Sequence, residues 1–273
     1  TVDQANLLDH STCSYACEHF VLLFSGSAGT SAFMEGIARL RGVAKYGYEP
    51  LYALRPNVSA AIKEAERIFN LKQSANVHVH GFKAREWSIR ADPVTWRAMV
   101  KKYKVCVMWM ARLNGVEWAF DWAHKARKRG YTVHDLFKDL TPRNPVFRKI
   151  QNAKYGAQFN KSNSIFNPRV RFHISMDDAR KILRSRLARA SVPRTCATAT
   201  SHPSCTAQIL DPDGTCTLGL TYEDFAYQRQ VLYQRVALHL GTDTASASQA
   251  AGDIRKFRKS SLPGICNKFA DFD

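Results

Sequence analysis

A run of small residues follows the first strongly apolar segment of the chain. Residues 19–24 (HFVLLF) predict a buried strand, and residues 32–40 have a helical pattern. Where a strand feeds a helix through such a loop, backbone N–H groups and the partial charge of the helix N-terminus can converge on a phosphate, although similar turns also serve purely structural ends. The loop lacks the G-x-x-x-x-G-K-[ST] pattern of nucleoside triphosphatases. The predicted anion-holding turn consists of Ser25, Gly26, Ser27, Ala28, Gly29, Thr30 and Ser31.

Three basic side chains could complete an anion site. Lys83 and Arg85 alternate along the chain, so both could meet one anionic ligand, or they form a basic surface at a strand end. Arg112 follows the apolar run 105–110, which predicts a strand, and ligands of open α/β sheets gather at the carboxyl ends of strands. The sequence therefore favours Arg112 as a ligand-binding residue.

Two kinds of residue could act as a general base. Glu49 precedes Pro50, where its carboxylate either accepts a proton from a nucleophile or begins a surface turn. His78 and His80 share one face of a predicted strand and are second candidates for a base or an acceptor contact, or they are ordinary histidines of the core or surface.

Apolar runs alternate with amphipathic helical patterns along most of the chain. This alternation predicts a three-layer α/β fold, in which a central parallel sheet is flanked by helices, and a single domain over residues 1–273. We expect an acceptor-side excursion at about 141–171 and a surface loop at about 191–214, which is rich in Thr, Ser, Pro and Cys. The predicted strands span 19–24, 77–80, 105–110 and 215–221, and the predicted helices 32–40, 58–70, 93–103, 115–129, 176–190 and 222–240.

The net charge of +17 predicts an anionic partner. Nucleic acid is disfavoured, because there is no zinc-finger spacing, aromatic ribonucleoprotein motif or repeated basic helix. The longest apolar runs are too short to cross a bilayer, and the sequence as given begins without a basic-then-apolar leader, so we expect no membrane span in it. The sequence is compatible with the Golgi lumen and with the cytoplasm.

The cysteines show no C-x-x-C spacing, so we expect no metal. Cys196, Cys205 and Cys216 crowd one stretch, where they form either a disulfide, which would imply an oxidising compartment, or free buried thiols. Asn57-Val-Ser59 and Asn160-Lys-Ser162 match the glycosylation sequon, a pattern that also occurs by chance.

Several stretches, in order along nearly the whole chain, resemble motifs of the sulfotransferase family, its carbohydrate branch more than its cytosolic aryl branch. The loop resembles the 5′-phosphosulfate loop, and the stretch that ends at Asp121 takes the place of the 3′-phosphate motif. Leu220–Phe225 resembles a late segment whose Glu223 and Asp224 would be structural. The stretches are Phe24–Ser31, Tyr48-Glu-Pro-Leu51, Gly81-Phe-Lys-Ala-Arg85, Met110–Asp121, Leu220–Phe225, and Phe257–Leu262 through Asn267.

The resemblance implies a P-loop-like sulfotransferase fold and an enzyme that moves a sulfuryl group from 3′-phosphoadenosine-5′-phosphosulfate (PAPS) to a hydroxyl or amine, leaving 3′-phosphoadenosine-5′-phosphate (PAP). A carbohydrate or small natural product is the favoured acceptor. It also implies that Glu49 is the base and that Lys83 lies near the bridging phosphosulfate region. Arg112, Arg258 and Lys259 would hold the 3′-phosphate.

Two positions depart from the family pattern. Ser27 stands where the family usually has Lys or Arg, so the phosphosulfate cation must come from elsewhere, with Lys83 the nearest candidate. Asp121 stands where a Ser is expected, and an aspartate that faces a phosphate would repel it. A degenerate, non-catalytic protein that binds polyanions or nucleotides, or a P-loop-like phosphotransferase, are the alternatives.

Overall fold

The chain divides into two compact units, one of Thr1–Asn114 with Arg189–Arg258 and one of Gly115–Ala188 with Lys259–Asp273. All residues that the computed structural model describes belong to the first unit. They are residues 13–24, 29–47, 49–114, 196 and 202–252. The single domain over 1–273 stays a prediction, and the excursion predicted at 141–171 lies outside the described residues.

Five parallel strands form one sheet in the order β2-β3-β1-β4-β5. Every residue of β1, β3 and β4 is buried. Burial on both faces explains why β1 and β4 appear in the sequence as nearly continuous apolar runs, whereas β3 also buries His80 and Lys83. The predicted α/β class with a central parallel sheet is confirmed. The strands are β1 (His19–Phe24), β2 (Val43–Lys45), β3 (Val79–Ala84), β4 (Val105–Ala111) and β5 (Thr217–Thr221).

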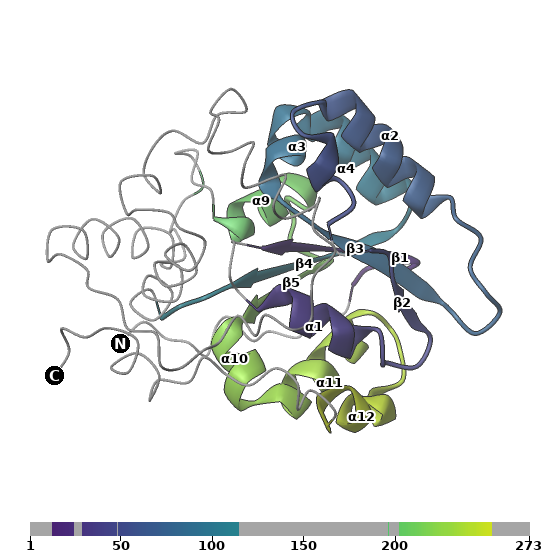
Figure 1. Cartoon of the computed structure of the whole chain (residues 1–273), viewed down its shortest axis with the longest axis vertical. Coiled ribbons are helices and arrows are strands. Elements are labelled where there is room, and N and C mark those ends of the chain that lie inside the picture. Colours follow the sequence, from purple (N-terminus) through teal and green to yellow (C-terminus); the bar gives the residue numbers. More distant parts are fainter. Residues whose placement is uncertain (1–12, 25–28, 48, 115–195, 197–201, 253–273) are drawn as a thin grey trace, which may run out of the picture. The chain divides into compact units, whose positions relative to one another are not determined.

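Helices cover both faces of the sheet (Figure 1). One face carries α1 (Thr30–Ile37), α10 (Tyr222–Tyr227), α11 (Arg229–His239) and α12 (Ala247–Gly252). The other carries α2 (Val58–Phe69), α3 (Glu86–Ala91), α4 (Pro93–Lys102) and α9 (Pro203–Leu210). Two short 3₁₀ turns, η2 (Tyr52–Leu54) and η3 (Thr244–Ser246), complete the described elements. Among the described residues, no helix is long and apolar enough to span a bilayer.

Alternate residues of the strands enter the two cores. Phe20 and Leu22 of β1 pack under α1 and α11, whereas Val21 and Leu23 pack under α2 and α4. Because β1 is buried on both faces and paired on both edges, its position is fixed from four sides.

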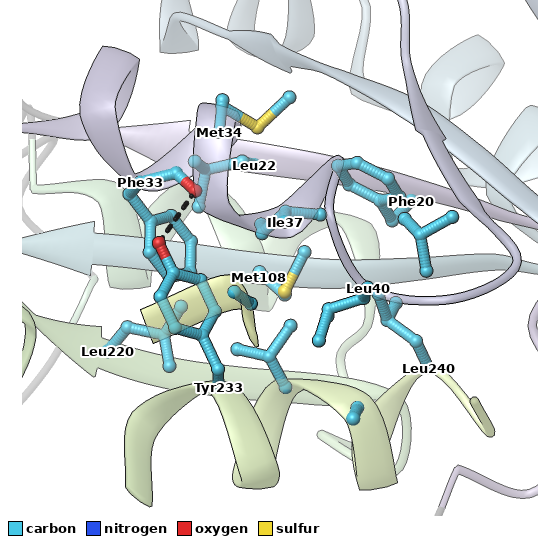
Figure 2. Packing of buried hydrophobic residues seen from close by; sticks show 14 of the residues in the cluster. Phe20, Leu22, Phe33, Met34, Ile37, Leu40, Met108, Leu220, Tyr233 and Leu240 are labelled. Atoms are coloured by element: carbon cyan, nitrogen blue, oxygen red, sulfur yellow. Dashed lines mark hydrogen bonds between the residues drawn. The ribbon is translucent and has the colours of Figure 1, made fainter. Parts of the chain in front are cut away.

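Helix α1 is held against α11 by an aromatic pair (Figure 2). The rings of Phe33 and Tyr233 stack with centroids 5.5 Å apart, and the Tyr233 hydroxyl donates to the Phe33 carbonyl at 3.1 Å. Gly36 leaves the space that this hydroxyl occupies, since a Cβ there would lie 1.8 Å from it. The helix that begins at the end of the small-residue loop is therefore fixed in the core.

Several predicted boundaries were wrong. The strand predicted at 77–80 runs over Val79–Ala84, because Gly81, Lys83 and their neighbours continue the strand. The helix predicted at 222–240 breaks at Gln228 into α10 and α11. Part of the loop predicted at 191–214 is the helix α9. The segment is rich in Thr, Ser and Pro, so the spacing of its buried residues Cys205, Ala207 and Leu210 did not stand out as a helical pattern.

Three disulfides join distant parts of the described chain. Cys13 pairs with Cys216, Cys17 with Cys106, and Cys196 with Cys205. The first two tie the segment before β1 to β4 and to the residue before β5. Closing loops of 203 and 89 residues removes much conformational freedom from the unfolded chain, which stabilises the folded one.

Two buried histidines make stability depend on pH. Burial lowers the pKa of His202 and of His239 from the ordinary 6.5 to about 4. The unfolded chain therefore takes up these protons below pH 6.5, whereas the folded chain does not until about pH 4. The free energy of unfolding is highest above pH 6.5 and decreases as the pH drops towards 4. At pH 5 it is lower than at neutral pH by about 2 kcal/mol per histidine. Urea unfolding midpoints at pH 7.5 and pH 5.0 measure this loss.

The variant His202→Asn isolates one of the two protons. The His202 side chain caps α9 by accepting from the Ser204 N–H, and Asn keeps an acceptor there without a titrating ring. We expect the variant to lose only the contribution of His202, about 2 kcal/mol between pH 7.5 and pH 5.0, and exposed His78→Asn to leave the pH dependence unchanged. An equal pH dependence in His202→Asn and the wild type would show that burial of His202 does not cause the effect.

Candidate functional site at the carboxyl end of the sheet

Lys83 contacts the last residue of the predicted anion-holding turn and the residue before the turn. Its side chain is 3% exposed, and its ammonium donates to the Ser31 hydroxyl at 2.8 Å. The same ammonium lies 4.9 Å from the centroid of the Phe24 ring. Phe24 ends β1, and Ser31 lies in the first turn of α1. The charge of Lys83 is therefore held between the end of β1 and the start of α1. Ser25, Gly26, Ser27 and Ala28 lie outside the described residues.

Glu49 forms ion pairs with both Lys83, which lies in β3, and Arg85, which directly follows this strand. Its carboxylate lies 3.5 Å from the Lys83 ammonium and accepts from Nε of Arg85 at 2.8 Å, with 13% of the side chain exposed. Two nearby cations favour the ionised carboxylate, the form that can accept a proton. The structure thus brings together Glu49, Lys83 and Arg85, which the sequence predicted as separate candidates.

Arg85 is enclosed by aromatic rings as well as by Glu49. Its guanidinium carbon lies 5.2 Å from the centroid of the Phe24 ring and 4.8 Å from that of Tyr52. Burial alone would lower the pKa of Arg85, but the attraction of the Glu49 carboxylate outweighs it, and the pKa is raised. The pair remains charged, which a largely buried position tolerates only when both partners are in contact.

A second buried cation lies on the other side of β1. Arg112 follows β4 directly and is 1% exposed, and its guanidinium carbon lies 4.4 Å from the centroid of the Tyr222 ring. The same ring packs on Gly29, where an added Cβ would lie 2.8 Å from two ring carbons. Gly29 has a φ of 71°, so both its backbone and its neighbour favour glycine. Tyr222 therefore links the end of the turn to Arg112.

Glu223 has the structural role that the sequence predicted. Its carboxylate accepts from the backbone N–H groups of Leu113 and Asn114 at 3.1 and 2.8 Å. Asp224 lies 3.9 Å from Arg235. The carboxylate of Glu223 thus holds the backbone that follows Arg112, and it positions that residue rather than meeting a ligand.

His80 lies apart from this group. It is the second residue of β3, near the amino end of the sheet, three residues before Lys83. Its Nδ1 lies 2.6 Å from the Gln73 side-chain nitrogen, and its Nε2 lies 2.8 Å from the Ile68 carbonyl. Both ring nitrogens are engaged in the core, so the geometry does not support the predicted catalytic role of His80.

Of the remaining residues that the sequence predicted for the site, only some belong to the described part of the chain. Thr30 is buried at the start of α1, next to Ser31. Asp121, Arg258 and Lys259 lie outside the described residues. Sequence reasoning missed Tyr222 and Tyr52, the aromatic partners of Arg112 and Arg85. A signal existed for Tyr222, because it directly precedes Glu223 at the start of a predicted helix.

One group of possible metal ligands occurs among the described residues. The sulfurs of Cys13, Cys17 and Cys106 lie within 4.8 Å of one another, near the amino end of β4. All three belong to disulfides, and a disulfide sulfur is not the thiolate that binds a metal. They lie at the end of the sheet opposite to Lys83 and Arg112.

Solved structures with distant similarity to this chain include two sulfotransferases. No protein-family model and no curated protein matches the chain. A sulfotransferase from Alicyclobacillus acidocaldarius is 12% identical, with a TM-score of 0.45, over 84% of this chain and 83% of that one. Mouse sulfotransferase SULT7A1, complexed with PAP, is 13% identical, with a TM-score of 0.46, over 96% of this chain and 74% of that one. Similarity at this level does not identify a reaction.

The role of Glu223 can be tested by its removal. Glu223→Ala deletes the acceptor of two backbone N–H groups, so we expect unfolding to cost about 2 kcal/mol less than in the wild type. Glu18→Ala is the matched control, because Glu18 makes a surface ion pair with Lys104 in which both partners are about half exposed, and its loss costs under about 1 kcal/mol. Urea denaturation measures both. Equal losses in the two variants would contradict the capping role.

Proposed function

We propose that the chain is a sulfotransferase, which moves a sulfuryl group from PAPS to a hydroxyl or amine of a carbohydrate or small natural product. One observation carries this proposal: two buried cations lie on the two sides of β1, Lys83 in a hydrogen bond with Ser31 at the end of the small-residue turn, and Arg112 over the Tyr222 ring that packs on Gly29. A turn with its N–H groups and flanking cations suits a donor with anionic groups at two places.

In this proposal the turn 25–31 and Lys83 hold the 5′-phosphosulfate. Lys83 supplies the cation that the turn itself lacks at Ser27, and its hydrogen bond to Ser31 places it at the turn. Arg112 would hold the 3′-phosphate, together with Arg258 and Lys259. The proposal therefore assigns the two ends of the donor to the two sides of β1.

The reaction needs a base, an in-line acceptor and stabilisation of the leaving group. The acceptor oxygen or nitrogen forms a bond to sulfur while the bond from sulfur to the bridging phosphate oxygen breaks, and PAP leaves with the electron pair. Glu49 would take the proton of the acceptor, and Lys83 would stabilise the negative charge that grows on the bridging oxygen. Their separation of 3.5 Å keeps base and cation at one place.

Ligand binding separates this function from its alternatives. A ligand that binds only the folded protein raises the thermal unfolding midpoint as its concentration exceeds the dissociation constant. We expect PAP to raise the midpoint in a dose-dependent way and ATP with magnesium to leave it unchanged, as measured by differential scanning fluorimetry. A response to ATP with magnesium alone would indicate a phosphotransferase, and a response to heparin alone a polyanion-binding protein.

Substitution of single lysines tests whether PAP binds at Lys83. Lys83→Met should abolish the response to PAP, because it removes the cation at the turn. Lys102→Met is the matched control, since Lys102 is 62% exposed on α4 and pairs with Glu66. Loss of the response in both variants would point to general charge rather than to Lys83.

The base is tested by Glu49→Gln. The amide keeps the shape of the side chain but cannot take a proton, so we expect sulfuryl transfer to an active acceptor to fall at least about 100-fold. The response to PAP should persist, because the substitution removes a negative charge near the donor. Transfer of radiolabelled sulfate from PAPS measures turnover.

Glu64→Gln provides the control for this variant. Glu64 pairs with Arg67 on the exposed side of α2, and its substitution should leave turnover unchanged. Turnover of Glu49→Gln equal to that of the wild type would remove Glu49 as the base, whereas loss of the PAP response as well would show that Glu49 mainly holds Lys83 and Arg85 in place.

A further inference from the structure

The sequon Asn57-Val-Ser59 lies on the surface of the described structure. Asn57 and Ser59 are both exposed, and so are Arg55 and Pro56, which precede them. The middle residue is Val58 rather than proline, as an acceptor of N-linked glycans requires. The immediate surroundings of Asn57 therefore leave room for a bulky polar group.

The side chain of Asn57 is compatible with attachment of a sugar. Asn57 caps α2, and its Oδ1 accepts from the N–H of Ala60 at 2.9 Å. A glycan is attached at Nδ2, so the cap and the attachment use different atoms of one amide. The buried residues of α2 begin at Ala61, and the sequon lies before them at the exposed start of the helix.

The disulfides provide an independent observation about the compartment. Six of the seven cysteines are paired in three disulfides, and two of these join segments 89 or more residues apart. Such disulfides form and persist in the secretory pathway and outside the cell, whereas the cytosol keeps thiols reduced. N-linked glycans are added to exposed sequons of secreted proteins, so both features point to one compartment.

We propose that the chain matures in an oxidising secretory compartment and carries an N-linked glycan at Asn57. The donor is a polyprenyl diphosphate-linked oligosaccharide: the bond from sugar C1 to the diphosphate oxygen breaks, a bond from C1 to Asn57 Nδ2 forms, and one Nδ2 proton is released with the diphosphate. Each disulfide forms from two thiols, whose two electrons and two protons pass to a disulfide oxidant of the compartment. The proposal is independent of sulfuryl transfer.

The test is expression of the full chain behind a cleavable secretion signal in eukaryotic cells. The secreted protein is treated with a peptide N-glycosidase and compared by gel mobility, with Asn160→Gln in every sample to remove the second sequon. We expect one glycan-sized increase in mobility for this background and none after Asn57→Asp or Ser59→Ala. Asp keeps the helix cap, so loss of the glycan is separated from loss of folding.

Mass spectrometry completes the test. Release of the glycan in heavy-oxygen water should convert Asn57 to labelled Asp, and Ser59→Thr should retain the glycan. Alkylation of the denatured, unreduced protein should modify at most one cysteine, because the three disulfides of the described residues use six of the seven. An unmodified Asn57 in secreted, folded protein would overturn the glycan, and modification of most cysteines would overturn the oxidised state.

Discussion

The burial of the Lys83 ammonium is the constraint on which the candidate site depends. A charge that is 3% exposed must be compensated within the protein, and Glu49 and Ser31 provide this compensation. Glu49 comes from the segment after β2, and Ser31 from the start of α1. The need to compensate one charge therefore draws three separate segments to the carboxyl end of the sheet.

The strand order places the two buried cations of the site on the two sides of the central strand β1. In the order β2-β3-β1-β4-β5 the chain leaves β1 towards one edge of the sheet and later returns to build the other edge. Neighbouring connections thus diverge at β1, the kind of place where open α/β sheets bind ligands. Lys83 lies near the end of β3 on one side of β1, and Arg112 directly follows β4 on the other side.

The sequence predicted β1, β4, α2 and α4 well, because each has a clear apolar pattern, but it missed β2 and most of β3, whose buried residues include His80, Gly81 and Lys83. It also named Glu49 and Lys83 as candidates through the family resemblance, and Arg112 because it follows a strand. It did not predict which candidates meet: the contact of Glu49 with Lys83 depends on how the connection after β2 folds back on β3. His80 was proposed for its chemistry, but its partners Gln73 and Ile68 come from a loop and a helix end that alternation along a strand does not reveal.

The sheet has a consequence for how a ribosome delivers this chain. Strand β4 ends at Ala111 and its partner β5 begins at Thr217, so more than a hundred residues must emerge before that edge can pair. Contacts between segments so far apart form slowly. The nascent polypeptide therefore exposes an unpaired apolar strand edge during synthesis, and Cys13 emerges 203 residues before its partner Cys216, so we expect folding of this chain to require chaperones during synthesis.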